Sequence, residues 1–193
     1  MDKKKTELLF DLAEANDGYV SVANAASFGI AQTYLCALEE EGFFLKVSKG
    51  LYIRKGYTRD DFFELAFRYH KAVFSFHSAL FLHGLTKQPS IEVKLPHNSF
   101  TSGIEGVTCR HVGNKEYSLG QSFVVTPQGN LVNSYDLERT LIDLLRHREE
   151  FDKETFLSLW HQGKEKSPYP EKLRLYAEAF HVEGELSLLE YLD

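Results

Sequence analysis

The spacing of apolar residues near the start of the chain predicts two short helices. In TELLFDLAEANDGYV, Leu8, Leu9 and Leu12 recur at helical intervals on one stripe, and Gly18 can end the helix. SVANAASFG follows, and Ser21 has the side chain of a good helix cap. The small residues of this second segment would let another helix approach it closely.

A third helix is predicted in IAQTYLCALEEEG, after a turn at Gly29. Leu35 and Leu38 fall on one of its faces, whereas Gln32 and Thr33 point away from that face near the amino-terminal end. Two short helices joined through a glycine turn are typical of a helix-turn-helix. We therefore expect Gln32 and Thr33 to meet base edges, because a glutamine can pair with adenine through two hydrogen bonds.

The next stretch, FFLKVSKGLYIRK, alternates between apolar and polar residues and predicts a β-hairpin. Phe44, Leu51 and Ile53 can face a core, and the turn falls at Ser48 to Gly50, where the glycine suits a positive φ. A hairpin directly after a recognition helix is a wing. Cations at its tip would lie beside the phosphates that flank the major groove.

This arrangement gives a set of candidate DNA-binding residues on the third helix and on the hairpin. They are Gln32, Thr33, Tyr34, Lys46, Ser48, Lys49, Arg54 and Lys55. The alternative is that the cations only keep an exposed hairpin edge soluble and that the helix residues are ordinary surface residues. The third helix has no Arg or Lys and ends in three glutamates, so we expect it to enter the groove amino end first.

The overall charge of −6 over 193 residues excludes a protein that binds nucleic acid through its whole surface. Any anion-binding surface must be local. The two cysteines, Cys36 and Cys109, form no metal-binding pattern, and neither a signal peptide nor a membrane span is evident. We expect a cytoplasmic protein with no metal and no cofactor.

The second half of the chain predicts a small sheet with helices packed on it and a helical tail. Strands are expected at 90–96, 106–112, 122–126 and 131–134, and helices at 61–70, 76–84, 135–147, 152–162, 170–180 and 184–192. Ser75, Asp152 and Pro170 are the expected start signals of three of these helices. The predicted fold class is therefore α+β, with a winged helix-turn-helix domain at 1–57 and a mixed α/β domain at 58–193.

Three segments in this order resemble the AbiEi family of antitoxins: EEEGFFLKVSKGLYIRKGY (39–57), SALFLHGL (78–85) and ERTLIDLL (138–145). Members of this family are transcriptional regulators of type IV toxin–antitoxin, or abortive-infection, loci. The resemblance implies a winged helix that binds inverted repeats in its own promoter and represses the operon. It further implies a carboxy-terminal domain that counteracts a nucleotidyltransferase toxin without a stable complex, in a protein that is monomeric in solution and cooperative on DNA.

No arrangement of catalytic residues is evident, so we expect no enzyme and no catalytic residue. The eight histidines lack a metal-ligand spacing, and neither a Gly-x-Ser-x-Gly elbow nor a phosphate-binding glycine loop occurs. Arg139 and Asp143 are the candidates for a surface that confers antitoxicity, against the simpler interpretation of an intrahelical i, i+4 pair. Phe100, Tyr117 and Tyr169 are candidates for an exposed patch that binds a partner.

Two other functions fit the same pattern. One is a winged-helix transcription factor whose carboxy-terminal domain binds a small effector or a protein, with no toxin partner. The other is an interaction module whose winged helix binds protein instead of DNA, which the glutamates at 39–41 would favour.

Overall fold

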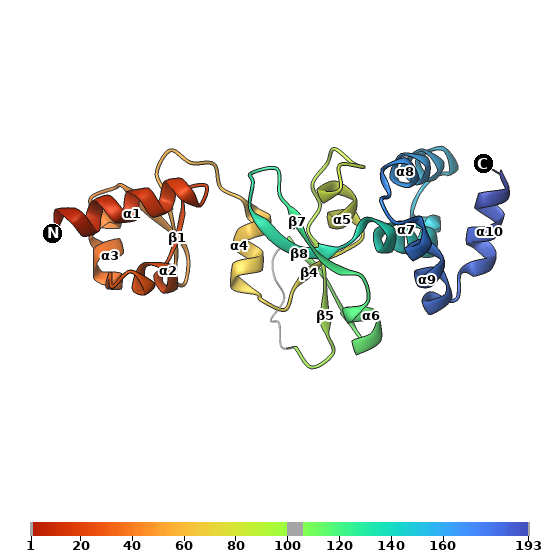
Figure 1. The fold of residues 1–193 in the computed structure, drawn as a ribbon, viewed down its shortest axis with the longest axis horizontal. Helices are drawn as coiled ribbons and strands as arrows, with labels where there is room; N and C mark the ends of the chain where they lie inside the picture. The colour runs from red at the N-terminus through yellow and green to blue at the C-terminus, as the bar shows by residue number, and fades with distance from the viewer. Residues whose placement is uncertain (1, 100–105, 193) are drawn as a thin grey trace. The chain divides into compact units, whose positions relative to one another are not determined.

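The computed structural model describes residues 2–99 and 106–192, and the chain has a mixed α+β fold with two sheets (Figure 1). It divides into two compact units. Unit 1 comprises residues 1–70 and 125–131, and unit 2 comprises residues 71–124 and 132–193.

Unit 1 contains four helices and a three-stranded antiparallel sheet in the order β1-β3-β2. Its elements are α1 (Lys3–Ala15), β1 (Tyr19–Ser21), α2 (Val22–Ser27), α3 (Gln32–Glu40), β2 (Phe44–Ser48), β3 (Leu51–Arg54) and α4 (Asp61–Arg68). The three predicted helices and the hairpin are confirmed, and the Ser21 side chain caps α2 by accepting from the Asn24 amide at 2.9 Å. β1 was not predicted, and its pairing with β3 places β3 at the centre of the sheet.

β3 does not alternate between buried and exposed residues, because helices pack on both faces of the sheet. Tyr52 is fully buried beside Val20 and Phe44, on the face that α1, α2 and α3 cover. Leu51 and Ile53 are buried on the opposite face, where Phe63 and Phe67 of α4 pack against them. Because helices cover both faces, every residue of β3 except Arg54 is buried.

Unit 1 extends beyond the predicted boundary at residue 57 because α4 is tied into it by buried hydrogen bonds. Asp60 caps α4, and its carboxylate also accepts from the Thr126 hydroxyl at 2.5 Å and the Asn130 side-chain amide at 2.9 Å. The hydroxyl of Tyr19 donates to Glu64 at 2.9 Å and accepts from the Asp60 amide at 2.7 Å. Burial raises the pKa of Tyr19, and the neighbouring Glu64 carboxylate adds to the shift.

Unit 2 is built on a five-stranded mixed sheet in the order β6-β5-β4-β8-β7. The strands are β4 (Val73–Phe74), β5 (Glu92–Pro96), β6 (Thr108–Val112), β7 (Gln121–Val125) and β8 (Leu131–Tyr135). The four predicted strands are confirmed, and the two-residue β4 was missed. β4 runs antiparallel to β5 and parallel to β8, while β5 and β6 are parallel.

The helices of unit 2 are α5 (His77–Leu82), α6 (Asn114–Ser118), α7 (Leu137–Arg146), the 3-10 turn η1 (Arg148–Glu150), α8 (Lys153–Lys166), α9 (Pro170–Phe180) and α10 (Glu183–Leu192). α7 is buried along almost its whole length, and α5, α8 and α9 pack against it. The start signals at Asp152 and Pro170 are confirmed. The predicted cap at Ser75 is wrong, because α5 begins after Phe76, and the Ser75 hydroxyl is buried without a hydrogen-bond partner among the described residues.

Within residues 2–99 and 106–192, no helix combines the length and the apolar character that crossing a membrane requires.

Candidate nucleic-acid interface

The first turn of α3 presents two exposed polar side chains, Gln32 and Thr33. The helix is anchored behind them by Leu35 and Leu38, which are buried in the core of unit 1. It is anchored to the sheet as well, since the Cys36 thiol and the Tyr52 hydroxyl lie 3.6 Å apart. Burial raises the pKa of Tyr52, which keeps its phenol neutral at this junction.

Lys46 projects from the hairpin on the side of α3. In the β2–β3 register it lies directly opposite Tyr52, and direct partners across antiparallel strands point to the same face of a sheet. Tyr52 points toward Cys36 on α3, one turn after Gln32. The Lys46 side chain is exposed and forms no ion pair within the described part of the chain.

Lys49 stands at the tip of the hairpin, as predicted. It is exposed, and Gly50 beside it has a φ of +82° that permits the tight return of the chain. The adjacent candidate Ser48 is half-buried, and its hydroxyl has no hydrogen-bond partner among the described residues. The tip is held against α2, because the Val22 amide donates to the Gly50 carbonyl at 2.8 Å.

The candidates Arg54 and Lys55 lie at the base of the hairpin and not at its tip, where cations were expected to lie beside phosphates. The strand register pairs Arg54 with Phe44, the first residue of β2. The Arg54 guanidinium stacks over the ring of Phe10 at 4.9 Å and lies 4.0 Å from the Glu14 carboxylate. The pairing register, which the sequence does not reveal, separates these two cations from the tip.

A cation beside α3 was missed because it comes from another helix. The ammonium of Lys5 on α1 lies over the ring of Tyr34 on α3, 5.4 Å from its centre. Tyr34, a predicted phosphate-contacting residue, is half-buried at this contact. Lys5 therefore supplies positive charge next to a helix that has none of its own.

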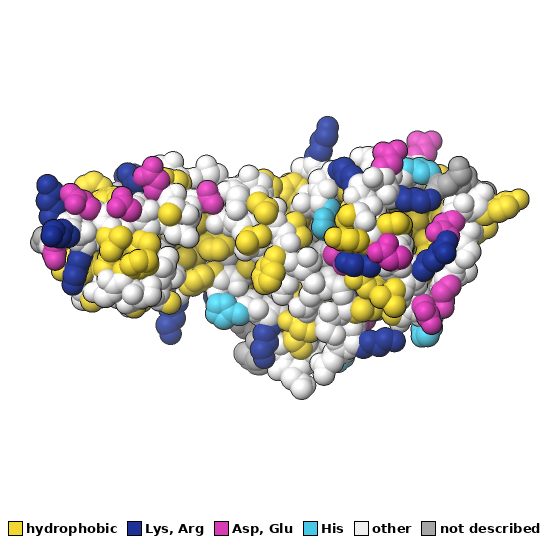
Figure 2. Space-filling view, in the orientation of Figure 1, with side chains coloured by type: hydrophobic (Ala, Val, Ile, Leu, Met, Phe, Trp, Pro, Cys, Tyr) yellow, Lys and Arg dark blue, Asp and Glu magenta, His cyan; other side chains and the backbone are white. Residues whose placement is uncertain are grey.

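Cationic and acidic side chains lie together at the end of unit 1 where α1 begins (Figure 2). Lys3, Lys4 and Lys5 follow one another there, and Lys3 lies 3.9 Å from the Glu7 carboxylate. The carboxylates of Glu40 and Glu41 are exposed at the carboxyl end of α3, away from Gln32 and Thr33. The exposed carboxylates therefore lie at the opposite end of α3 from its exposed amino-terminal turn.

The candidate antitoxicity residues Arg139 and Asp143 do not line a surface. They form the expected i, i+4 ion pair at 3.3 Å, but both side chains are buried in unit 2. The Arg139 guanidinium also donates to the carbonyl oxygens of Glu116 and Leu119, and it packs between the rings of Tyr135 and Phe180. These contacts hold α6 against α7, so Arg139 stabilises the fold of unit 2.

Lys94 completes this cluster from the middle of β5. Its ammonium lies 3.0 Å from Asp143 and 3.1 Å from Glu116. Burial acts to raise the pKa of both carboxyl groups, yet the surrounding cations together outweigh it, and the pKa of each is lowered. These cations are Lys94 and Arg146 for both groups, with Arg139 in addition for Asp143. Both carboxylates are therefore ionised at neutral pH and balance the buried cations.

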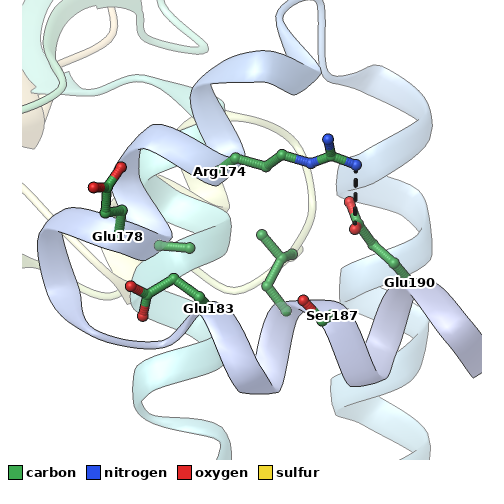
Figure 3. A pocket seen from close by; sticks show the side chains of 7 residues that line it. Arg174, Glu178, Glu183, Ser187 and Glu190 are labelled. Atoms are coloured by element: carbon green, nitrogen blue, oxygen red, sulfur yellow. Dashed lines mark ion pairs between the residues drawn. The ribbon is translucent and has the colours of Figure 1, made fainter.

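A concavity of about 390 Å³ lies between α9 and α10 in unit 2 (Figure 3). Arg174 reaches across it to Glu190 at 3.6 Å, and Glu178, Glu183 and Ser187 line the remainder. Three carboxylates and one arginine give it an acidic character. It contains no nucleophile paired with a base, and no group of side chains suited to a metal ion occurs among the described residues.

The histidines and exposed aromatics add no second site. His83 is held at the Tyr135 carbonyl at 2.9 Å, and burial lowers its pKa. Tyr169 is exposed, whereas Tyr117 is half-buried and donates to the Lys71 carbonyl at 2.9 Å. Phe100 lies outside the described residues.

Comparisons with protein-family models and with curated proteins find no match for this chain.

Proposed function

We propose that unit 1 is a winged-helix domain that binds double-stranded DNA, and that the chain represses transcription from its own promoter. In this proposal α3 enters the major groove with its first turn, and the β2–β3 hairpin is the wing. Two copies meet at an inverted repeat, each contributing one α3 helix.

The observation that carries the proposal is the position of free cations around an exposed helix start. Lys46 and Lys49 have no ion-pair partner among the described residues, and Lys46 shares a sheet face with the residue that contacts α3. α3 has nine residues, which corresponds to roughly 13 Å of helix and fits the major groove. Cations beside such a helix gain free energy by releasing counterions from phosphates.

Each residue has a distinct role in this mechanism. Gln32 and Thr33 read base edges, because they are the exposed polar residues of the first turn. Lys46, Lys49 and Lys5 neutralise phosphates, which adds affinity but no sequence preference. Glu40 and Glu41 disfavour the opposite approach, so the charge of the helix fixes its orientation on DNA.

We further propose that the chain is the antitoxin of a type IV toxin–antitoxin locus and that unit 2 counteracts a nucleotidyltransferase toxin. The support is the resemblance of SALFLHGL and ERTLIDLL, segments that form parts of α5 and α7. Since Arg139 and Asp143 are buried, we assign them to the stability of unit 2 and not to contact with a partner.

The DNA-binding proposal is tested by titrating the full-length protein against the promoter fragment upstream of its gene. We expect a retarded complex at low salt that unlabelled promoter DNA competes away more effectively than random DNA of the same length. A Lys87→Gln variant, which removes an exposed lysine of unit 2, serves as the matched control and should bind like the wild type. Absence of a complex at low salt would refute the proposal.

The antitoxin proposal is tested separately by co-expression with the gene adjacent to its own, which the proposal expects to encode a nucleotidyltransferase. We expect the full-length protein, expressed from an unrelated promoter, to restore growth. The Lys46→Gln/Lys49→Gln variant should restore it equally well, because repression is not needed in this arrangement. Failure of the wild type to protect would refute the antitoxin role and leave the regulator role intact.

A further inference from the structure

A second concavity lies at the base of the hairpin in unit 1. It has a volume of about 460 Å³ and is lined by Phe10, Gly42, Phe43, Arg54 and Lys55. Pockets for small molecules span roughly 300–1,000 Å³. Two aromatic rings and two cations therefore share a space of the size that a small ligand occupies.

The aromatic wall is created by the way α3 ends. The Gly42 amide donates to the Glu39 carbonyl and the Phe43 amide to the Leu38 carbonyl, both at 2.9 Å, with Gly42 at a φ of +79°. This exit directs Phe43 onto Phe10, edge to face, with ring centres 5.7 Å apart. Phe43 remains 50% exposed, so part of its ring is free to stack.

The cationic wall comes from the end of β3. The Lys55 amide donates to the Phe43 carbonyl at 2.8 Å, which fixes the backbone beside the ring, and the Lys55 side chain has no partner among the described residues. Within the described part of the chain, Arg54 is ion-paired with Glu14 alone, at 4.0 Å, and the Glu14 side chain is 75% exposed. Such a pair contributes little stability and is easily exchanged for another anion.

The pocket is separate from the tip of the hairpin. Arg54 belongs to the first strand pair of the hairpin and Lys49 to its tip, about four residues or roughly 13 Å further along the strands. A ligand at the base therefore leaves the tip free.

We propose that this pocket binds a small planar aromatic anion, a ring that carries a phosphate or a carboxylate group. The ring stacks on Phe43 while the anionic group meets Arg54 and Lys55, taking the place of the Glu14 carboxylate. This ligand site goes beyond the proposed DNA-binding function and does not depend on it.

Isothermal titration of the full-length protein, without DNA, tests the site with four probes. AMP and benzoate carry both a ring and an anion, whereas adenosine lacks the anion and inorganic phosphate lacks the ring. We expect AMP or benzoate to bind at least tenfold more tightly than adenosine and phosphate, and the stronger of the two distinguishes a phosphate from a carboxylate ligand. Equal affinity for all four probes, or no binding of any, would overturn the proposal.

Variants then locate the binding. Arg54→Gln and Lys55→Gln should each weaken binding roughly tenfold, as expected for the loss of a charge-assisted hydrogen bond. Glu14→Gln should strengthen binding several-fold, a change that a purely structural role of Arg54 would not produce. Lys87→Gln, with the same loss of charge in unit 2, should leave the affinity unchanged.

Two outcomes would contradict this location. One is equal weakening by Lys87→Gln and Lys55→Gln, which would indicate unspecific attraction to positive charge. The other is that the Glu14→Gln variant binds the anionic probe more weakly than the wild type does. If Arg54→Gln fails to fold, Lys55→Gln and Glu14→Gln still decide, because both of these side chains are exposed.

Discussion

The two units use their cations in opposite ways. In unit 1, Lys46 and Lys49 project into solvent with no partner among the described residues. In unit 2, Lys94 and Arg139 are buried and lie within 3.3 Å of the Asp143 carboxylate. Cations that are already neutralised internally hold a fold together, whereas free cations can neutralise an external anion. The sequence alone does not separate these roles, because Lys46 and Lys94 both stand between two apolar residues of a predicted strand.

The largest effect is expected when the buried ion pairs of Lys94 and Arg139 with Asp143 are disrupted. Asp143→Asn removes a carboxylate that Lys94, Arg139 and Arg146 share. Among the described residues, these three cations then have Glu116 as their one remaining ion-pair partner. We expect a loss of about 3–5 kcal/mol in the free energy of unfolding, measured by urea denaturation at pH 7. Glu149→Gln, at an exposed position, is the matched control and should change the stability little. Equal stability of the Asp143 variant and the wild type would mean that the cluster does not stabilise the fold.

The same pair predicts a pH dependence. The pKa of Asp143 is lowered in the folded protein, so its contribution is fully present above the pKa of a free aspartate, about 3.9. It is lost as the pH falls below that value, through the lowered pKa of the native state. We therefore expect the stability difference between wild type and Asp143→Asn to be constant from pH 5 to 7 and to shrink below pH 4. A difference that grows on acidification would contradict this account.

The helices and the hairpin were predictable, whereas the relations between distant residues were not. Local periodicity and the glycine positions located α1, α2, α3 and the β2–β3 hairpin. β1 was missed because three residues are too few to show alternation. The approach of Lys5 to Tyr34 joins positions 29 residues apart and carries no local signal. The burial of Arg139 was missed because its partners Glu116 and Phe180 come from other elements of unit 2.

A smaller effect concerns sequence preference. Gln32→Ala should reduce discrimination between the promoter and mismatched sites by about 1–3 kcal/mol, since it removes a two-bond contact to a base. Competition binding with single-base operator variants measures this, and the salt dependence should stay unchanged because no phosphate contact is lost. A uniform loss of affinity for all sequences would assign Gln32 to the backbone instead.

The smallest expected effect tests the cation that comes from α1. Lys5→Gln should weaken promoter binding by at most about 1 kcal/mol and lower the salt slope by about 0.9, because one phosphate contact is removed. Lys87→Gln is again the control for loss of one positive charge. If Lys5→Gln and Lys87→Gln change the affinity and the salt slope equally, Lys5 acts only through the overall charge of the protein and contacts no phosphate.

The salt dependence of promoter binding tests the central claim, that the free lysines of the hairpin contact DNA phosphates. We propose to measure the affinity of the wild type and of the Lys46→Gln/Lys49→Gln variant across a range of salt concentrations. The logarithmic slope of the variant should be smaller in magnitude by roughly 1.8 per monomer, about 0.9 for each lost contact. Identical slopes for the two proteins would contradict the account.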